Sequence, residues 1–243
     1  MSSRSTEAAP IGPALGIVLD LDDTLYLERD FAAGGFEAAG RCAHDALGLE
    51  GFGPLCQRLF DEGVRGHLFD RALEIMGVRD AGEAVGALVD AYRTHRPAIR
   101  LPPDADRFIA AHRSDRLGLV TDGPSGVQRG KIAALGLAER IDAIVVTGEL
   151  GPGFGKPHRR PFRQVARRLG LPAERLVYIA DNALKDFVTP NALGWLTIAV
   201  ERRGRIHVAP PPSPAHAPRR SVSDLDEAGW VLSGWRAAMR AAA

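Results

Sequence analysis

Short continuous runs of apolar, often β-branched residues recur along the chain, each bounded by polar residues, glycine or proline. Such runs without apolar–polar alternation are typical of strands that are buried on both faces of a sheet. They predict five strands, at residues 15–19, 117–120, 144–146, 176–180 and 196–200. Residues 221–243 resemble a further short strand and a helix that complete the core.

Between the later strands, apolar residues recur at intervals of three and four, which is the spacing of one helix face. One such helix is predicted to have Pro161 at its first position and to end at Gly170. Ser125 and Gln128 have the spacing of a capping box, which predicts a second helix start. Strands that alternate with helices predict an α/β fold with a Rossmann-like parallel sheet covered on both faces.

About a hundred residues separate the first predicted strand from the second, and this interval has helical patterns instead of strand patterns. A contiguous helical insertion after the first strand of a parallel sheet predicts a separate unit. We therefore expect an α-helical domain at residues 26–102, inserted into an α/β core of residues 1–25 and 103–243. Its helices are predicted at residues 31–47, 55–63, 65–75 and 83–95.

Composition narrows the range of partners. The 243 residues are 45% apolar and 25% charged, and 31 Lys and Arg nearly balance 30 Asp and Glu. We therefore expect neither nucleic acid nor an anionic membrane as a partner. Residues 1–13 lack the apolar core of a secretion signal, and no run approaches the roughly 18 apolar residues of a membrane span. Cys42 and Cys56 are expected to be reduced packing residues of a cytoplasmic protein of unknown oligomeric state.

Polar side chains that could take part in catalysis or binding follow the predicted strands. Asp20 and Asp22 follow the first strand, and Thr121 follows the second. Lys156 lies in the loop after the third strand, and Asp181 follows the fourth. The carboxyl ends of parallel strands lie at one edge of the sheet, where such folds bind ligands. Residues distant in sequence are therefore expected to converge there.

This convergence would bring up to five carboxylates toward one crevice: Asp20, Asp22, Asp23, Asp181 and Asp186. Their mutual repulsion requires a cation. An all-oxygen ligand set that leaves room for substrate and water favours Mg²⁺. The Lys156 ammonium and the Thr121 hydroxyl could then bind the phosphoryl oxygens that the metal does not contact. The sequence therefore predicts a phosphate site, although Asp186 could instead cap the following helix.

Several of these residues lie in ordered motifs that resemble the signatures of the haloacid dehalogenase (HAD) superfamily. Residues 20–24 (Asp-Leu-Asp-Asp-Thr) resemble the first signature, and residues 121–123 (Thr-Asp-Gly) end the second strand. Lys156-Pro157 has the place of the third signature, and residues 180–187 resemble the acidic fourth one. The resemblance spans about residues 16–200, and four ordered motifs with their strand context are a specific signal.

The resemblance implies a phosphatase with Asp20 as nucleophile and Asp22 as general acid/base. Phosphate would be bound by Thr121, by the backbone amide of Asp122 and by Lys156. Mg²⁺ would be held by Asp20, the backbone carbonyl of Asp22, Asp181 and Asp186. The helical insertion would be a cap of the C1 type that selects a small phosphorylated metabolite, such as a nucleotide or sugar phosphate. Relatives usually carry Gly in place of Ala180 and often Asn in place of Asp122, so weaker or pH-sensitive phosphate binding is expected at most.

The same fold also supports other functions. A haloacid dehalogenase would need no metal, but dehalogenases of the family lack the second acidic residue, here Asp22. A phosphomutase would retain the phosphoryl group, and a regulatory member would bind without useful turnover. The natural substrate depends on cap residues, for which the mixed cationic and aromatic residues 63–71 are a candidate. The Pro-rich residues 210–218 are expected to form an extended surface loop.

Overall fold

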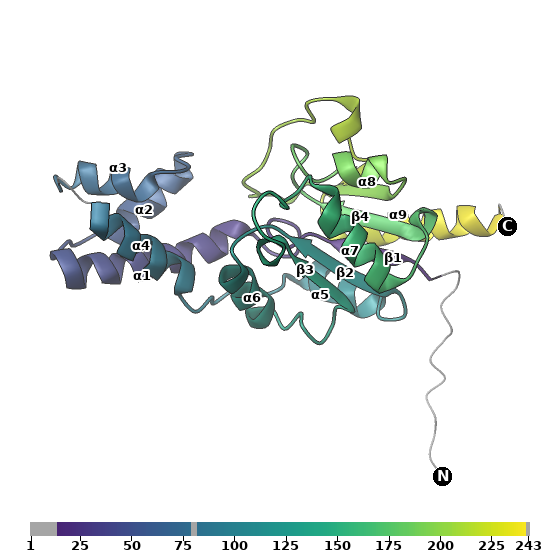
Figure 1. Cartoon of the computed structure of the whole chain (residues 1–243), viewed down its shortest axis with the longest axis horizontal. Helices are drawn as coiled ribbons and strands as arrows, with labels where there is room; N and C mark the ends of the chain where they lie inside the picture. The colour runs from purple at the N-terminus through teal and green to yellow at the C-terminus, as the bar shows by residue number, and fades with distance from the viewer. Residues whose placement is uncertain (1–13, 79–81, 242–243) are drawn as a thin grey trace, which may run out of the picture.

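The computed structural model describes residues 14–78 and 82–241, and these contain a six-stranded, fully parallel sheet (Figure 1). The strand order is β3-β2-β1-β4-β5-β6, which is that of doubly wound nucleotide-binding folds. The predicted α/β fold class is confirmed. The strands are β1 (Gly16–Leu19), β2 (Arg116–Thr121), β3 (Ala143–Val146), β4 (Leu176–Ala180), β5 (Leu196–Val200) and β6 (Arg220–Val222).

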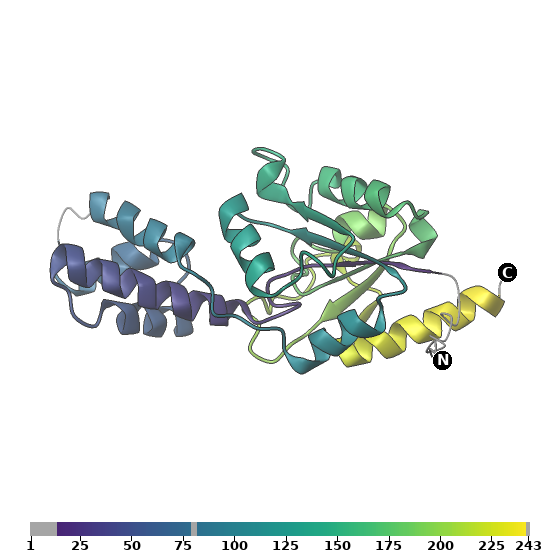
Figure 2. The ribbon, with the colours of Figure 1, turned by 90° about the horizontal axis from the view of Figure 1, so that it is seen from below.

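Helices cover both faces of this sheet because the strands are apolar on both faces (Figure 2). Ile17 and Leu19 of β1 belong to one core cluster, and Val18 between them belongs to the other. The first cluster includes side chains from α5 (Pro103–Ala111), α6 (Ser125–Ala134) and α9 (Leu225–Ala241). The second includes side chains from α7 (Arg159–Leu169), which lies beside α8 (Val188–Ala192).

Two local details of these helices differ from the expectation. The helix predicted at Ser125 is present, but its N-cap is Pro124 and no side chain caps it. Ser125 Oγ donates instead to Glu149, and Gln128 turns toward the strand ends. The capping-box prediction was therefore wrong, because a tertiary partner outcompetes the local bond. Helix α7 begins two residues earlier than predicted, which places Pro161 third in the helix.

The first four helices after β1 gather apart from the sheet and have a core of their own (Figures 1 and 2). We call them the helical unit: α1 (Glu28–Leu47), α2 (Phe52–Asp61), α3 (Leu68–Ile75) and α4 (Gly82–Thr94). Helix α1 connects the two cores, because Phe31 in its first turn packs in the sheet's cluster whereas Phe36 packs in that of the helical unit. The proposed boundaries at residues 26 and 102 stay a prediction.

The loop after β5 ties both connections of the helical unit to the sheet. The buried Arg202 donates from Nε to the backbone oxygen of Thr24 at 2.8 Å and from Nη2 to Asp104 Oδ2 at 2.6 Å. Thr24 precedes the helical unit, and Asp104 follows it. The Ile206 N–H donates to Asp23 Oδ2 at 2.7 Å, and Ile206 also packs against the core of the helical unit. The loop therefore contributes to the position of the helical unit over the sheet.

The C-terminal segments match the sequence prediction in part. The predicted C-terminal strand and helix are present as β6 and α9. The Pro-rich segment is largely exposed, but it contains a short 3-10 helix (Pro214–His216), and Asn191 Nδ2 donates to the backbone oxygens of Ala215 and Ala217. A wholly extended loop was therefore the wrong expectation. Within the described residues, none of the helices is both long and apolar enough to span a bilayer, and residues 1–13 lie outside the description.

Candidate active site

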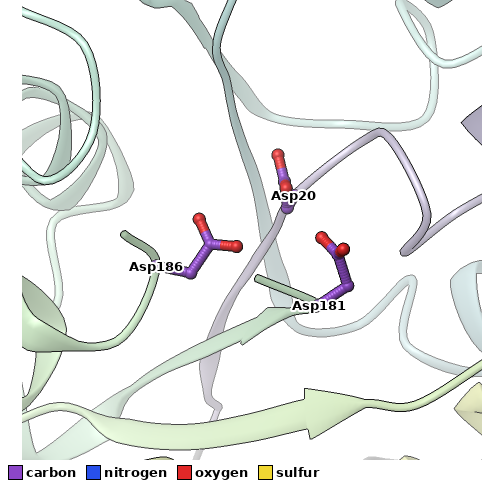
Figure 3. A group of neighbouring side chains, drawn as sticks. All are labelled: Asp20, Asp181 and Asp186. Atoms are coloured by element: carbon purple, nitrogen blue, oxygen red, sulfur yellow. The ribbon is translucent and has the colours of Figure 1, made fainter. Parts of the chain in front are cut away.

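Three buried carboxylates meet at the carboxyl edge of the sheet. Asp20 directly follows β1, Asp181 directly follows β4, and Asp186 lies in the loop that continues from Asp181. One oxygen of each side chain lies within 4.8 Å of those of the other two. Figure 3 shows the three side chains facing a common space. This arrangement follows from the topology, because β1 and β4 are neighbours in the sheet and end at the same edge.

Lys156 joins this cluster from the loop after β3. Its fully buried ammonium lies 2.8 Å from Asp20 Oδ1 and 2.7 Å from Asp186 Oδ1, and it donates to the Tyr178 hydroxyl at 3.1 Å. A buried lysine stays charged only where partners replace its hydration. Burial lowers the pKa of Lys156, but the charges of Asp186 and Asp20 outweigh it and raise that pKa well above its usual value. Lys156 is therefore a permanent positive charge in the site.

One ammonium does not compensate three carboxyl groups. Burial, together with the charge of Asp186 and against the opposing effect of Lys156, raises the pKa of Asp20 to about 7. Burial and the charges of Asp20 and Asp186 raise the pKa of Asp181 to about 9. Asp181 Oδ2 is buried and has no hydrogen-bond partner among the described residues. An orphaned carboxylate oxygen beside two further carboxylates fits a hard divalent cation, and the oxygen-only donor set fits Mg²⁺.

These pKa shifts predict how metal and pH act together on stability. The folded, metal-free protein retains protons on Asp20 and Asp181 that the unfolded chain has lost above its pKa of about 4. Its stability therefore falls as the pH rises from about 4 toward 9. A Mg²⁺ ion held by these carboxylates would need them deprotonated, and it would therefore bind more tightly over the same range. We expect the rise in Tm on adding Mg²⁺ to be larger at about pH 8.5 than at about pH 6. Each tenfold gain in affinity is worth about 1.4 kcal/mol, or roughly 3 °C.

Thermal unfolding with EDTA and with Mg²⁺ at the two pH values measures this difference. Asp181→Asn serves as the control, because it removes the carboxyl group of the site with the most raised pKa and should abolish most of the pH-dependent gain. An equal Mg²⁺ effect at both pH values in the unmutated chain would contradict the assignment of the cation to these carboxylates.

Asp22 and Asp23 lie outside this cluster, although all five carboxylates were expected at one crevice. Asp23 has a left-handed backbone with φ of 54°, and its buried carboxylate accepts the backbone N–H groups of Glu28 at 2.9 Å and Ile206 at 2.7 Å. Its role is thus to shape the chain between β1 and α1. Burial raises the pKa of Asp23, and these two backbone N–H groups offset the effect only in part.

The Asp22 carboxylate is surrounded by hydrogen-bond donors. Lys131 Nζ lies 2.6 Å from Oδ1, which also accepts from the Tyr26 hydroxyl, and Gln128 Nε2 donates to Oδ2 at 2.9 Å. Burial raises the pKa of Asp22, but the Lys131 charge and these hydrogen bonds outweigh it and lower that pKa below its usual value. Asp22 is therefore ionised and restrained at both oxygens.

The second motif lies beside these groups at the end of β2. Thr121 is buried, and its hydroxyl accepts from Gln128 Nε2. The Asp122 carboxylate accepts from Thr147 Oγ1 at 2.9 Å, from the Lys156 backbone N–H at 3.0 Å and from Lys185 Nζ at 3.1 Å. Burial raises the pKa of Asp122, but the charges of Lys156 and Lys185 outweigh it and lower that pKa. Asp122, which stands where relatives often carry Asn, therefore stabilises the Lys156 loop, and the charges of Lys156 and Lys185 compensate its negative charge.

The sequence did not identify the side chains that hold Asp22, which are Tyr26, Gln128 and Lys131. Gln128 and Lys131 had a detectable signal, because they lie three apart on a helix and are buried next to the apolar Ile132. A buried Lys on the inner face of a helix needs a partner, but the sequence does not show which one. Tyr26 gave no such signal, since a tyrosine near the end of an apolar stretch is ordinarily a packing residue.

Comparison with known proteins agrees with this geometry. Residues 15–187 match the model of a family described as haloacid dehalogenase-like hydrolase. The chain belongs to this family. A second model, for HAD-hydrolase-like proteins, matches residues 153–228. The predicted membership is confirmed, and the chain is an enzyme of this hydrolase family.

Two relatives of the chain are named phosphatases. A phosphoserine phosphatase of Thermus thermophilus is 32% identical over 204 residues, which is 79% of this chain and 75% of that protein. A glyceraldehyde 3-phosphate phosphatase of Methanocaldococcus jannaschii is 28% identical over 194 residues, 76% of this chain and 84% of that protein.

Solved structures share the fold across almost the whole chain. The putative HAD-hydrolase YfnB from Bacillus subtilis, bound to magnesium, has a TM-score of 0.64 with 21% identity, covering 90% of this chain and 98% of that one. A 2-haloacid dehalogenase from Pseudomonas syringae has a TM-score of 0.61 with 23% identity, covering 92% and 100%. At such identities the likeness concerns the fold, so the reaction must be argued from the site.

Proposed function

We propose that this chain is a magnesium-dependent phosphohydrolase that cleaves a small phosphomonoester through a phosphorylated Asp20. One observation carries the proposal: the Lys156 ammonium and the carboxylates of Asp20, Asp181 and Asp186 converge at the carboxyl edge of the sheet. A nucleophile between a fixed ammonium and a cation site suits a phosphoryl group, whose charge is spread over several oxygens.

In the first step, an Asp20 oxygen attacks phosphorus, and the bond between phosphorus and the leaving oxygen breaks. Asp22, which is ionised in the structure, must first take up a proton, and it then passes this proton to the leaving oxygen, which departs as a neutral alcohol. Lys156, the Thr121 hydroxyl and the backbone amide of Asp122 would bind the phosphoryl oxygens. Their fixed positions stabilise the developing charge without reorganisation.

In the second step, Asp22 accepts a proton from a water molecule that attacks phosphorus. The bond between Asp20 and phosphorus breaks, which releases inorganic phosphate and restores the Asp20 carboxylate. The ionised state of Asp22 in the structure is the one needed for this step. Asp22 therefore acts as an acid in the first step and as a base in the second, because the proton moves in opposite directions in the two steps.

Asp20, Asp181, Asp186 and the backbone carbonyl of Asp22 would hold Mg²⁺. When bound, this ion supplies positive charge that allows the anionic nucleophile and the phosphoryl group to approach each other. The unpartnered Asp181 oxygen supports its place in the ligand set. The same carboxylates repel one another without it, as the raised pKa values of Asp20 and Asp181 indicate.

The helical unit would act as a C1-type cap over a core of residues 1–25 and 103–243, and would select the substrate. Phosphoserine and glyceraldehyde 3-phosphate, after which two relatives are named, are three-carbon phosphomonoesters and therefore belong in the first substrate panel with nucleotide and sugar phosphates. Cys42 and Cys56 are free thiols, which is consistent with the expected cytoplasmic location.

Release of inorganic phosphate from this panel tests the proposal. We expect turnover with Mg²⁺, loss of at least about 100-fold in rate with EDTA, and recovery on adding Mg²⁺. Asp181→Asn should raise the Mg²⁺ concentration needed for half-maximal rate, whereas Asp30→Asn, an exposed change on α1, should leave it unchanged.

Halide release from a 2-haloacid that continues in EDTA would contradict the proposal and indicate a dehalogenase. Transfer of the phosphoryl group to a second position of the substrate, with no phosphate released, would indicate a phosphomutase. Binding of phosphomonoesters without turnover in the presence of Mg²⁺ would indicate a regulatory member of the family.

A further inference from the structure

The contacts of Asp22 indicate a functional role for helix α6. Two residues of this helix, Gln128 and Lys131, donate to different oxygens of the Asp22 carboxylate, at 2.9 and 2.6 Å. Gln128 Nε2 also donates to the hydroxyl of Thr121. Helix α6 therefore connects the proposed acid/base directly to a proposed phosphate-binding group. Because both side chains come from one rigid helix, their distances to Asp22 and Thr121 are fixed together.

Burying Lys131 costs more free energy than burying Gln128, because Lys131 carries a charge. Its side chain is only 5% exposed, and its ammonium lies over the ring of Phe31, 4.3 Å from the ring centre. Among the described residues, Asp22 is its only carboxylate partner within 4.0 Å. A buried ion pair is weak evidence for stability, because an apolar residue of similar size often fills the place equally well. The arrangement therefore points to orientation of Asp22.

We propose that Lys131 is a positioning residue for the reaction: it fixes Asp22 Oδ1 so that the carboxyl group is oriented toward the oxygen of the leaving group. The inference rests on the proposed function, in which Asp22 takes up a proton and passes it to that oxygen. Because loss of the Lys131 charge would favour this protonation, a slower reaction of a Lys131 variant reports the orientation of Asp22. Tyr26 donates to the same oxygen and Gln128 to the other, but neither carries a charge. A charge-assisted contact is the strongest of the three and contributes most to the orientation.

A positioning role has a distinctive kinetic signature. An alkoxide leaves only with a proton, whereas p-nitrophenolate leaves readily without one, so that disordering Asp22 penalises alkyl esters selectively. For Lys131→Met, we expect kcat/KM for the alkyl phosphate that the unmutated enzyme cleaves fastest to fall about 30-fold or more. For p-nitrophenyl phosphate it should fall less than about threefold. Both values report steps up to release of the alcohol, so breakdown of the phosphorylated enzyme does not affect them.

Matched variants separate positioning from structural damage. Arg129→Met removes a positive charge from the same helix, where Arg129 pairs with Glu149 on the surface, and should leave both substrates unaffected. Lys131→Gln keeps a donor without the charge and should recover part of the alkyl ester rate. If Lys131→Met does not fold, the ratio of kcat/KM for the two substrates is measured for Lys131→Gln instead, and a selective loss for the alkyl phosphate supports the positioning role.

Equal losses for the two substrates, or no loss for either, would overturn the positioning role while the proposed function stands. Full activity of Asp20→Asn would instead remove the proposed function itself. The two failures are therefore distinguishable. The first appears only in the ratio of kcat/KM for the two substrates, whereas the second appears as activity that persists in Asp20→Asn.

Discussion

Asp20→Asn is expected to lower kcat for phosphate release by about 10⁴-fold or more, because an amide cannot form the phosphorylated intermediate. This corresponds to roughly 5 kcal/mol or more of lost transition-state stabilisation. Asn has almost the same volume as Asp, so the packing around the buried position after β1 should persist. Substrate binding should survive as well, since Lys156, Thr121 and the cation ligands of the β4 loop stay in place.

The measurement is steady-state phosphate release together with substrate binding to Asp20→Asn in the presence of Mg²⁺. Asp30→Asn provides the matched control, because Asp30 is an exposed aspartate on α1 and its change should not alter kcat. Rapid quenching of the unmutated enzyme with a ³²P-labelled substrate should trap label on the protein, and Asp20→Asn should trap none. Undiminished turnover by this variant would exclude Asp20 as the nucleophile.

Much of the fold could be predicted because the signals were local and consistent. Each predicted strand is a continuous apolar run, and its burial on both faces follows from helices on both sides of a parallel sheet. The helices of the helical unit also follow from their spacing, although α2 begins at Phe52 rather than at residue 55. Element boundaries are weaker because caps and turns depend on tertiary partners, as Ser125 shows with its bond to Glu149.

The site was predictable only as far as strand ends determine it. Asp20 and Asp181 directly follow neighbouring strands, so topology brings them together once the strand order is known. The surroundings of Asp22 could not be predicted in the same way. Lys131 reaches Asp22 across 109 positions of sequence, and the contact depends on the rotation of α6 about its axis. Periodicity indicates which face of a helix is buried, but it does not indicate which polar side chain on that face meets a partner.

The same limit explains Asp23 and Asp122. Both are acidic residues next to the predicted catalytic positions, and both were expected to add negative charge near the substrate. Asp23 instead accepts backbone N–H groups of Glu28 and Ile206, and Asp122 supports the loop of Lys156. The position of an aspartate after a strand does not show which way its side chain points, so the sequence overestimated the negative charge that faces the phosphate.

The second large effect is expected for Lys156→Met, which removes the ammonium shared by Asp20 and Asp186. Removing one partner of a buried ion pair leaves the other charge uncompensated and costs about 3 kcal/mol or more of stability. It also removes a fixed positive charge from the phosphoryl oxygens, so kcat/KM should fall by about 10²- to 10³-fold. The pKa of Asp20 should rise further above about 7, because Lys156 lowers it in the unmutated chain. In the metal-free protein, a smaller fraction of the nucleophile is then ionised at neutral pH.

Lys185→Met gives the matched comparison. Lys185 also pairs with an aspartate of the site, Asp122, at 3.1 Å, but its side chain is 33% exposed. A pair of this kind contributes at most about 1 kcal/mol, and its loss should cost less than about tenfold in kcat/KM. Urea unfolding and kinetics of both variants, with Mg²⁺ present, measure the contrast. Lys156 is assigned to phosphate binding only if its removal costs much more activity than that of Lys185. Comparable losses in the two variants would mean that the site responds to its total positive charge, and that the position of the Lys156 ammonium between Asp20 and Asp186 is not what the reaction requires.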